Sequence, residues 1–524
     1  MWRKIFRIYL CILIVLPLLN HAATLNEQLE KLLRTSDKQT QEDLIKKIVK
    51  SNPPIDSLIL FLQNREFKKP AKTGIITEKN LCIDGVVRKF CWYVPVSYDP
   101  SKKSPLLVYL HGGVSRRELI DEIETYVKES PFLKLADEQG YIILFPLGQD
   151  GATWWDSVGI SNVLQQVRIT KQKFNIDDNR VFMTGFSDGG SGSFLFAMCY
   201  PTDFAGFLPC NGFIGVASID GGMHTYLINL FNRSLYVINT DLDRLYPAAQ
   251  MTPIMEFAQN AGANILYRIY TGIGHEFDYA DAELPLMAKF METHPRALSP
   301  VIKWESADPG LGCMWLVIDS ITSQGHEPWY QDYNMEVIDE QVMFGFLDDE
   351  KYQGPGVRVD KIVGDSTLCA LVGIEEGDII IKLGNMNVNN LDDVSKYKED
   401  KKCGDLAEIT ILRQGQERKL QGRFPGPFKN NLFLREKPSA RVEAQFCANK
   451  FSIKSSQLGA FTIYIHPEMV KLDQNIMIEL NGKKIYDKKI TASLEFILCN
   501  FLKNRDRELI YVNKIFFNLK EDIP

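Results

Sequence analysis

The spacing of apolar residues divides the chain into three stretches. Between residues 25 and 66 apolar side chains recur every three or four positions, interrupted by Pro53-Pro54, which predicts short amphipathic helices. From about residue 75, runs that are apolar on both faces, such as "PLLVYLHGG" and "YIILFPLG", alternate with helical stretches. Such runs predict a mostly parallel sheet with helices on each side. After His294, strand patterns follow one another with few helices between them, which predicts a mostly β remainder.

The first residues have the pattern of an export signal. Three basic residues precede an apolar run over residues 8–19, and small residues follow it. The run is too short to span a membrane comfortably, so we expect cleavage after Ala22 or Ala23. The sequence therefore predicts a secreted or periplasmic protein with no stable membrane span. An uncleaved N-terminal anchor is the alternative.

The composition excludes some classes of function but does not identify one. A chain of 524 residues is too long for one core, and its 45% hydrophobic and 24% charged residues are typical of soluble proteins. The net charge of −6, without a basic cluster, argues against nucleic acid as a partner. The ten cysteines are scattered and form no CxxC pair, so we predict neither a disulfide framework nor a metal site.

The stretch "VFMTGFSDGG" predicts a catalytic nucleophile. A strand pattern ends at Gly185, Ser187 follows two residues later, and Gly189 opens a helical pattern. This is the G-x-S-x-G elbow, in which a strained turn presents the serine hydroxyl at the end of a sheet. An ordinary glycine-rich turn between a strand and a helix is the alternative.

A serine nucleophile needs a base, and the base needs an orienting carboxylate. His275 follows the strand pattern "LYRIY" and lies in a loop, which makes it the predicted base. Asp243 and Asp241 both follow the strand pattern "LYVINT", and we favour Asp243 because a turn ending in Pro247 follows it.

Two backbone amides are candidates for an oxyanion hole. The strand pattern "LLVYL" runs into His111-Gly-Gly113, where a loop amide is available to point at the oxyanion, and His111 itself is predicted to be structural. The amide of Asp188, directly after the serine, would supply the second donor. We predict Gly113 and Asp188 as this pair.

The stretch "TWWDSVG" follows another strand end. Trp154 and Trp155 are candidate walls of the acyl or leaving-group pocket, and Asp156 is a candidate polar pocket residue. Packing of the two tryptophans in the core is the alternative.

With these motifs in view, residues 70–295 resemble α/β-hydrolases of the secreted esterase and polyhydroxybutyrate-depolymerase-like group. The resemblance lies in "PLLVYLHGG", "GFSDGG", "DRLYP" and "GIGHEF", in that order. It implies hydrolysis of small or polymeric carboxylic esters through an acyl-serine, without a metal or organic cofactor. Prolyl-oligopeptidase-type serine peptidases use the same triad and are the alternative. A non-catalytic envelope scaffold that binds peptides is a second one.

A second resemblance covers residues 338–426. "GPGVRVDKIV" and "GIEEGDIIIKLGNMNV" look like a PDZ domain of the bacterial periplasmic-protease type. It implies that Phe344, Gly345 and Phe346 form a loop that holds a peptide C-terminus or an extended peptide. The strand patterns on either side of this segment indicate one β-sandwich-like domain interrupted by it.

The sequence thus predicts an α/β-hydrolase followed by a β-sandwich-like domain with an inserted PDZ domain. The predicted parts are a signal peptide (1–23), a helical leader (24–68), the catalytic domain (69–298), the sandwich-like domain (299–336 and 430–522) and the PDZ domain (338–426).

Overall fold

The computed structural model describes residues 24–114, 123–340, 342–349 and 351–519, so the predicted signal peptide lies outside the described residues. The chain forms two compact units: residues up to Tyr333 together with those from Phe433 onward, and the intervening Asn334–Leu432. Within the described part of the chain, no helix is long and apolar enough to cross a membrane. Nine cysteines there are free thiols, six of them buried.

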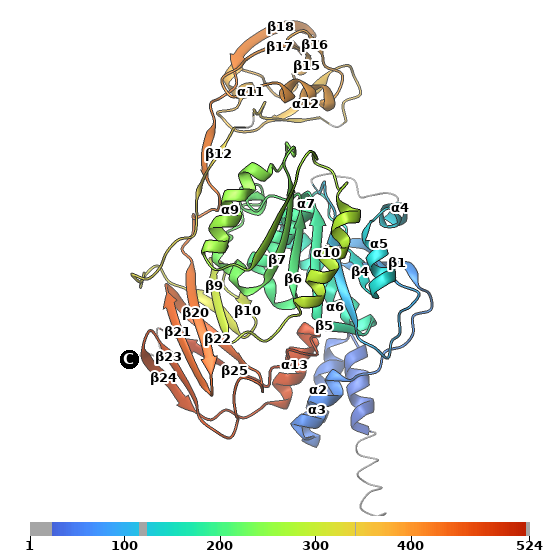
Figure 1. Cartoon of the computed structure of the whole chain (residues 1–524), viewed down its shortest axis with the longest axis vertical. Coiled ribbons are helices and arrows are strands. Elements are labelled where there is room, and N and C mark those ends of the chain that lie inside the picture. Colours follow the sequence, from blue (N-terminus) through green and yellow to red (C-terminus); the bar gives the residue numbers. More distant parts are fainter. Residues whose placement is uncertain (1–23, 115–122, 341, 350, 520–524) are drawn as a thin grey trace, which may run out of the picture. The chain divides into compact units, whose positions relative to one another are not determined.

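An eight-stranded sheet forms the centre of the first unit, with the order β1-β2-β4-β3-β5-β6-β7-β8 (Figure 1). β2 runs antiparallel to both of its neighbours, and the strands from β3 to β8 are parallel to one another. The strands are β1 (Gly74–Leu81), β2 (Val87–Val94), β3 (Ser104–Leu110), β4 (Ile142–Phe145), β5 (Ile176–Phe186), β6 (Gly206–Cys210), β7 (Ser234–Thr240) and β8 (Ile265–Tyr270). Every residue of β3 and β4 is buried, as their continuous apolar runs predict. This strand order, with one reversed strand, is that of an α/β-hydrolase-like fold.

Helices pack on this sheet through apolar faces. α4, α5 and α10 share one hydrophobic cluster with the strands, while α7 contacts β3, β5 and β6 and is buried from Gly189 to Cys199. The helices of this region are α4 (Ile123–Lys128), α5 (Phe132–Gln139), α6 (Ser157–Lys173), α7 (Asp188–Cys199), α8 (Val216–Ile219), α9 (Ala248–Asn260) and α10 (Ala280–Thr293), with 3-10 turns η1 (Pro201–Asp203) and η2 (Leu227–Asn232).

Two further sheets complete the first unit and share one hydrophobic core, which contains Trp304, Trp315 and Phe451. Their orders are β10-β11-β22-β25 and β24-β23-β21-β20-β9. Their strands are β9 (Val301–Ser306), β10 (Gly312–Cys313), β11 (Leu316–Ile321), β20 (Ala440–Cys447), β21 (Lys450–Ser456), β22 (Leu458–Ile465), β23 (Ile476–Leu480), β24 (Lys483–Lys488) and β25 (Asn513–Asn518).

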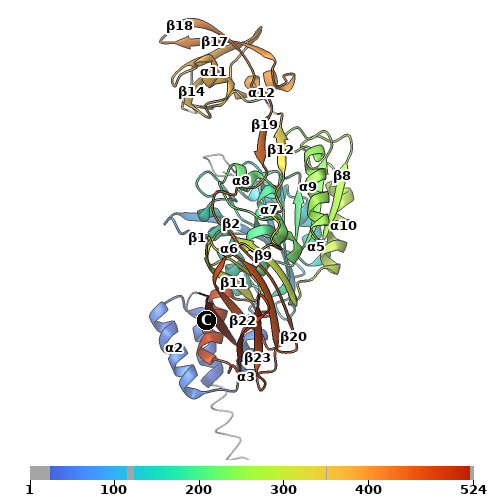
Figure 2. The same cartoon turned by 90° about the vertical axis from the view of Figure 1, so that its left-hand side faces the viewer.

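The N-terminal helices belong to this second core and not to the hydrolase sheet. The helix over residues 24–34, α2 (Lys38–Ser51) and α3 (Ile55–Gln63) bury most of their leucines and isoleucines in the same cluster as α13 (Leu494–Asn504). Figures 1 and 2 show α2 and α3 beside the C-terminal elements. Segments from opposite ends of the chain therefore stabilise one another.

The second unit has its own sheet and core. The sheet order is β13-β14-β15-β17-β18, β16 pairs with β15, and β12 pairs with β19 in a separate ribbon. The described elements of this unit are the helices α11 (Leu368–Val372) and α12 (Leu391–Glu399) and the strands β12 (Glu336–Asp339), β13 (Phe346–Asp348), β14 (Val357–Ile362), β15 (Ile379–Leu383), β16 (Met386–Asn387), β17 (Leu406–Arg413), β18 (Gln416–Arg423) and β19 (Phe428–Asn431). Its core is a separate cluster that includes Phe344 and Ile380.

Candidate active site

Ser187 stands at a sharp corner between β5 and α7. Its backbone has φ 59° and ψ −122°, a combination that L-residues rarely adopt. The corner is tight because flanking glycines approach the end of β3: a Cβ on Gly189 would lie 1.9 Å from the Leu110 carbonyl oxygen, and one on Gly185 would lie 2.7 Å from it. The serine is therefore held by its surroundings in a strained conformation, at the N-terminus of a buried helix.

Three side chains from three loops meet at this corner. His275 Nε2 lies 2.8 Å from Ser187 Oγ, and His275 Nδ1 lies 2.7 Å from Asp243 Oδ2. The loops follow β5, β7 and β8, whose carboxyl ends share one edge of the parallel sheet. The Asp243 side chain is fully buried, whereas 21% of the His275 side chain is exposed. The carboxylate is thus shielded from water while the imidazole remains accessible to a substrate.

Asp243 is held as a carboxylate by a network of donors. Its Oδ1 accepts hydrogen bonds of 2.8 Å from the amides of Leu245 and Tyr246, and its Oδ2 accepts one of 2.9 Å from Asn211 Nδ2. Burial alone raises the pKa of Asp243, but the hydrogen bonds from His275, the Tyr246 amide and Asn211 outweigh it, so the pKa lies below its usual value.

The Asp188 carboxylate joins the elbow to two neighbouring loops. Its Oδ2 accepts a hydrogen bond of 2.9 Å from the Val114 amide, and its Oδ1 accepts one of 3.1 Å from the Tyr246 hydroxyl. The first residues of the loop after β3, up to Val114, are therefore fixed beside Ser187. A Cβ on Gly112 would lie 3.5 Å from Ser187 Oγ, and Gly113 has φ 67°. The absence of a side chain at Gly112 leaves space beside the hydroxyl.

The "TWWDS" stretch is mostly structural in its contacts. Trp154 is 1% exposed and donates to the His111 carbonyl oxygen at 2.8 Å. Asp156 caps α6 by accepting from the amides of Thr153 and Gly159. Trp155 is half-buried and packs beside Gly221, so of the two tryptophans it is the one with accessible surface.

In the second unit, the predicted peptide loop is built around Gly345. Its φ is 82°, and a Cβ there would lie 2.0 Å from Thr367 Oγ1, so the position requires glycine. Phe344 is 4% exposed and packs in the core, while Phe346 is half-buried at the start of β13. β13 is an edge strand of its sheet, so one of its two edges has no strand partner among the described residues.

Asn211 and Tyr246 belong to the site but were not expected from the sequence. Asn211 has φ 44° directly after β6, is fully buried, and also donates to Thr240 Oγ1 at 2.7 Å. An Asn-Gly pair at a strand end was the available signal, because asparagine tolerates positive φ. The Tyr246 ring lies against His275 with ring centroids 5.7 Å apart.

Comparison with known proteins gives local similarities to esterases. No family model matches the chain. It is 31% identical over 135 residues to a bifunctional acetylxylan esterase/xylanase of Neocallimastix patriciarum, covering 24% of this chain and 18% of that protein. It is 31% identical over 93 residues to acetylxylan esterase A of Aspergillus oryzae, covering 16% and 30% respectively. The chain thus spans less than a third of the length of either relative.

Solved structures align with less than half of the chain. A thermostable esterase aligns over 42% of this chain and 63% of its own, with 19% identity and a TM-score of 0.35. A ferulic acid esterase aligns over 41% and 97%, with 17% identity and a TM-score of 0.34. A dipeptidyl aminopeptidase IV of Bacteroides ovatus, described as putative, aligns over 42% and 36%, with 18% identity and a TM-score of 0.34. The fold assignment rests on the strand order and the corner at Ser187.

Proposed function

We propose that the chain is a serine hydrolase that cleaves carboxylic esters through an acyl-serine intermediate. The observation that carries this proposal is the unbroken chain of hydrogen bonds from Ser187 Oγ through His275 to the buried Asp243. It links a hydroxyl, an imidazole and a carboxylate in the order that nucleophilic catalysis requires.

In the proposed reaction, Ser187 Oγ attacks the ester carbonyl carbon while His275 Nε2 takes the hydroxyl proton. Asp243 holds the imidazole in position and stabilises its positive charge. The amides of Gly113 and Asp188 donate to the oxyanion, each with an effect of about 3 kcal/mol on the transition state. His275 then protonates the departing alcohol, and water, deprotonated by His275, releases the acid and restores Ser187.

Local similarity to acetylxylan esterases supports ester over amide hydrolysis, with a small-molecule or polymer ester as the substrate. One alternative is a serine peptidase of the prolyl-oligopeptidase type, which uses the same triad. The second alternative is a non-catalytic scaffold, which would have the same fold but no turnover.

Active-site labelling separates an enzyme from a scaffold. A fluorophosphonate probe should label the wild-type protein and fail to label Ser187→Ala, which should lose about 10⁴-fold or more in kcat. Equal labelling of both proteins would refute the assignment of Ser187. A panel of p-nitrophenyl esters of increasing acyl length, acetylated xylan and peptide p-nitroanilides should show turnover of esters and none of amides. Turnover of the anilides alone would favour the peptidase.

We further propose that residues 338–426 form a PDZ domain and that β13 accepts an extended peptide at its open edge. The glycine-dependent loop at Gly345, directly before that strand, supports this placement. Fluorescence titration of the full chain with peptides that end in a free carboxylate, and with their C-terminal amides, tests it. Tighter binding of the free acids is expected, and no binding of either kind would overturn the proposal.

The remaining domain plan and the export of the protein are also proposals. Residues 299–336 and 430–522 would form one sandwich-like domain, whose two sheets share a core. N-terminal sequencing of the exported protein should find cleavage after Ala22 or Ala23, and an intact N-terminus would indicate an anchor.

A further inference from the structure

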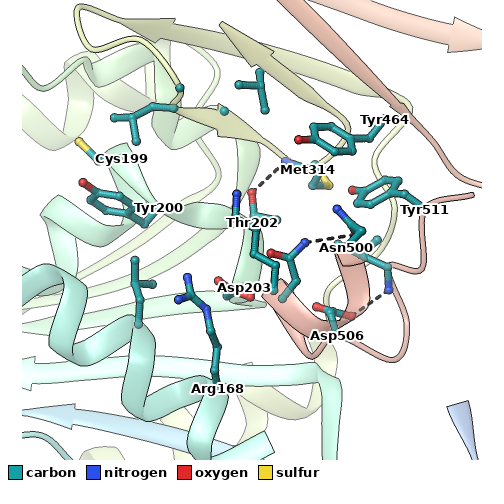
Figure 3. Close-up of a pocket in the computed structure, with 18 of the residues that line it drawn as sticks. Arg168, Cys199, Tyr200, Thr202, Asp203, Met314, Tyr464, Asn500, Asp506 and Tyr511 are labelled. Carbon is teal, nitrogen blue, oxygen red and sulfur yellow. Dashed lines mark hydrogen bonds between the residues drawn. The ribbon is translucent and has the colours of Figure 1, made fainter. Parts of the chain in front are cut away.

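A cavity of about 430 Å³ lies beside the C-terminal end of α7, the end opposite to Ser187. Figure 3 shows residues that line it. It is bounded by α6, the turn after α7, the β10–β11 hairpin and α13, all within the first unit. Ser187 precedes α7 and Tyr200 follows it, and a 12-residue helix is about 18 Å long. The cavity is therefore separate from the candidate catalytic centre, and its volume is within the range of about 300–1,000 Å³ that is usual for ligand pockets.

A buried hydroxyl in the cavity wall, that of Tyr511, has no partner among the described residues. Tyr511 is 4% exposed, and its hydroxyl makes no hydrogen bond within the part of the chain that the structure describes. A buried hydroxyl without a partner costs free energy, and a ligand that hydrogen-bonds to it would remove that cost. The Tyr464 ring lies beside it, with centroids 5.3 Å apart, and Tyr200 lines the same cavity (Figure 3). The wall thus combines aromatic faces with hydroxyl groups.

The charged groups of the cavity are of both signs. Arg168 and Lys503 line it, and the side chain of neither makes a hydrogen bond or an ion pair among the described residues. Three carboxylates also line it: Asp506 is paired with Arg296 at 2.6 Å, Asp203 lies 3.5 Å from Lys171, and Asp319 accepts from Thr462 at 2.7 Å. The cavity therefore offers hydrogen-bond donors and acceptors side by side, which a neutral ligand with many hydroxyl groups would match.

We propose that this cavity binds a neutral saccharide. The C–H faces of a pyranose ring pack on aromatic rings such as Tyr200 and Tyr464, and its hydroxyl groups are matched by Arg168, the Asn500 amide and the Tyr511 hydroxyl. Aromatic side chains supply apolar contact area at a low entropic cost, and planar guanidinium and amide groups supply directed hydrogen bonds. The site would hold a carbohydrate away from the serine, whether or not the ester proposed above is carried by that carbohydrate.

The test is a binding measurement on the full chain carrying Ser187→Ala, so that no turnover contributes. The protein is first screened on an array of neutral and anionic oligosaccharides, and the neutral ligands found are then titrated by saturation-transfer NMR at millimolar concentration. Neutral saccharides should bind, Tyr511→Phe should weaken the binding about three- to tenfold, and Arg168→Met should weaken it at least as much. Tyr486→Phe, on β24 and outside the cavity, is the matched control and should leave the affinity unchanged.

Three outcomes would overturn the proposal: no neutral saccharide binds, only anionic ones bind, or both cavity variants bind as tightly as their parent. Weaker binding by Tyr511→Phe will not result from unfolding, because this substitution removes an unsatisfied buried hydroxyl. The variant should therefore melt at the same temperature as its parent or higher. A fluorophosphonate-labelled wild-type protein should bind the saccharide as Ser187→Ala does. Loss of binding on labelling would place the ligand at the serine and refute a separate site.

Discussion

The backbone at Ser187 should cost measurable stability, and a pair of substitutions isolates that cost. Ser187→Ala and Ser187→Gly both remove the hydroxyl and its 2.8 Å contact with His275, so this loss cancels between them. Alanine keeps a Cβ at φ 59° and ψ −122°, a conformation whose strain is about 1–3 kcal/mol, and glycine relieves it. Glycine also gives the unfolded chain more freedom, which offsets about 0.5–1 kcal/mol. Ser187→Gly should therefore be more stable than Ser187→Ala by about 0.5–2 kcal/mol.

Urea denaturation followed by tryptophan fluorescence, together with hydrogen exchange of the β5–α7 segment, measures this difference. Ser191, which lies in the regular part of α7 and is buried, supplies the matched control. There the order should be reversed, with glycine less stable than alanine by about 1 kcal/mol. If Ser187→Gly were no more stable than Ser187→Ala, the claim that the fold holds this serine under strain would be refuted.

Three further predictions concern the surroundings of the site and the buried charges. Asp188→Ala should lower kcat about 10–100-fold with little change in KM, because the Val114 amide loses its hydrogen-bond acceptor. Asp188→Asn keeps an acceptor and should lower kcat less; equal reductions of kcat in both variants would contradict the acceptor role. Asp243 has a pKa below its usual 3.8 in the folded protein, so its stabilisation is complete above that pH and is lost as the pH falls through the lower value. In urea denaturation from about pH 7 to about pH 3, the stability advantage of the wild type over Asp243→Asn should shrink, and a constant gap would argue against it. Arg296→Met should reduce the free energy of unfolding by about 3–5 kcal/mol, because Asp506 keeps a buried charge without its bidentate partner; a loss below about 1 kcal/mol, as expected for the exposed Lys289→Met, would refute this.

The alternation of apolar runs and helices was sufficient to predict a mostly parallel sheet with helices on each side, because runs buried on both faces leave few alternatives. The hydrolase-like fold was expected from the resemblance of its motifs to those of a known family. The G-x-S-x-G pattern narrowed the candidate nucleophile to Ser187, because it places that serine between a strand pattern and a helical pattern. The choice between Asp241 and Asp243 depends on geometry: both follow β7, yet Asp241 is exposed and accepts from the Gly272 amide, while Asp243 turns inward to His275. Two carboxylates two residues apart give no periodic signal that separates them.

Other features depend on contacts between distant segments. Asn211 reaches Asp243 only because β6 and β7 are neighbours in the sheet. The leucines of the N-terminal helices predict an apolar partner but do not identify α13, more than 400 positions away in the chain, as that partner. Asp156 is a third case. An aspartate before a helix fits the sequence pattern of a helix cap and of a pocket residue alike, and only the position of its hydrogen-bond donors decides between them.

The ribbon of β12 and β19 joins the chain entering the second unit to the chain leaving it. Glu336 faces Asn431, and the Leu432 amide donates to the Met335 carbonyl oxygen at 2.9 Å. A protease that nicks either strand therefore leaves the unit tethered by the other, and release requires two cuts. The two ends of this unit already lie side by side. Deletion of the unit would therefore join two neighbouring positions, and the rest of the chain would need little rearrangement.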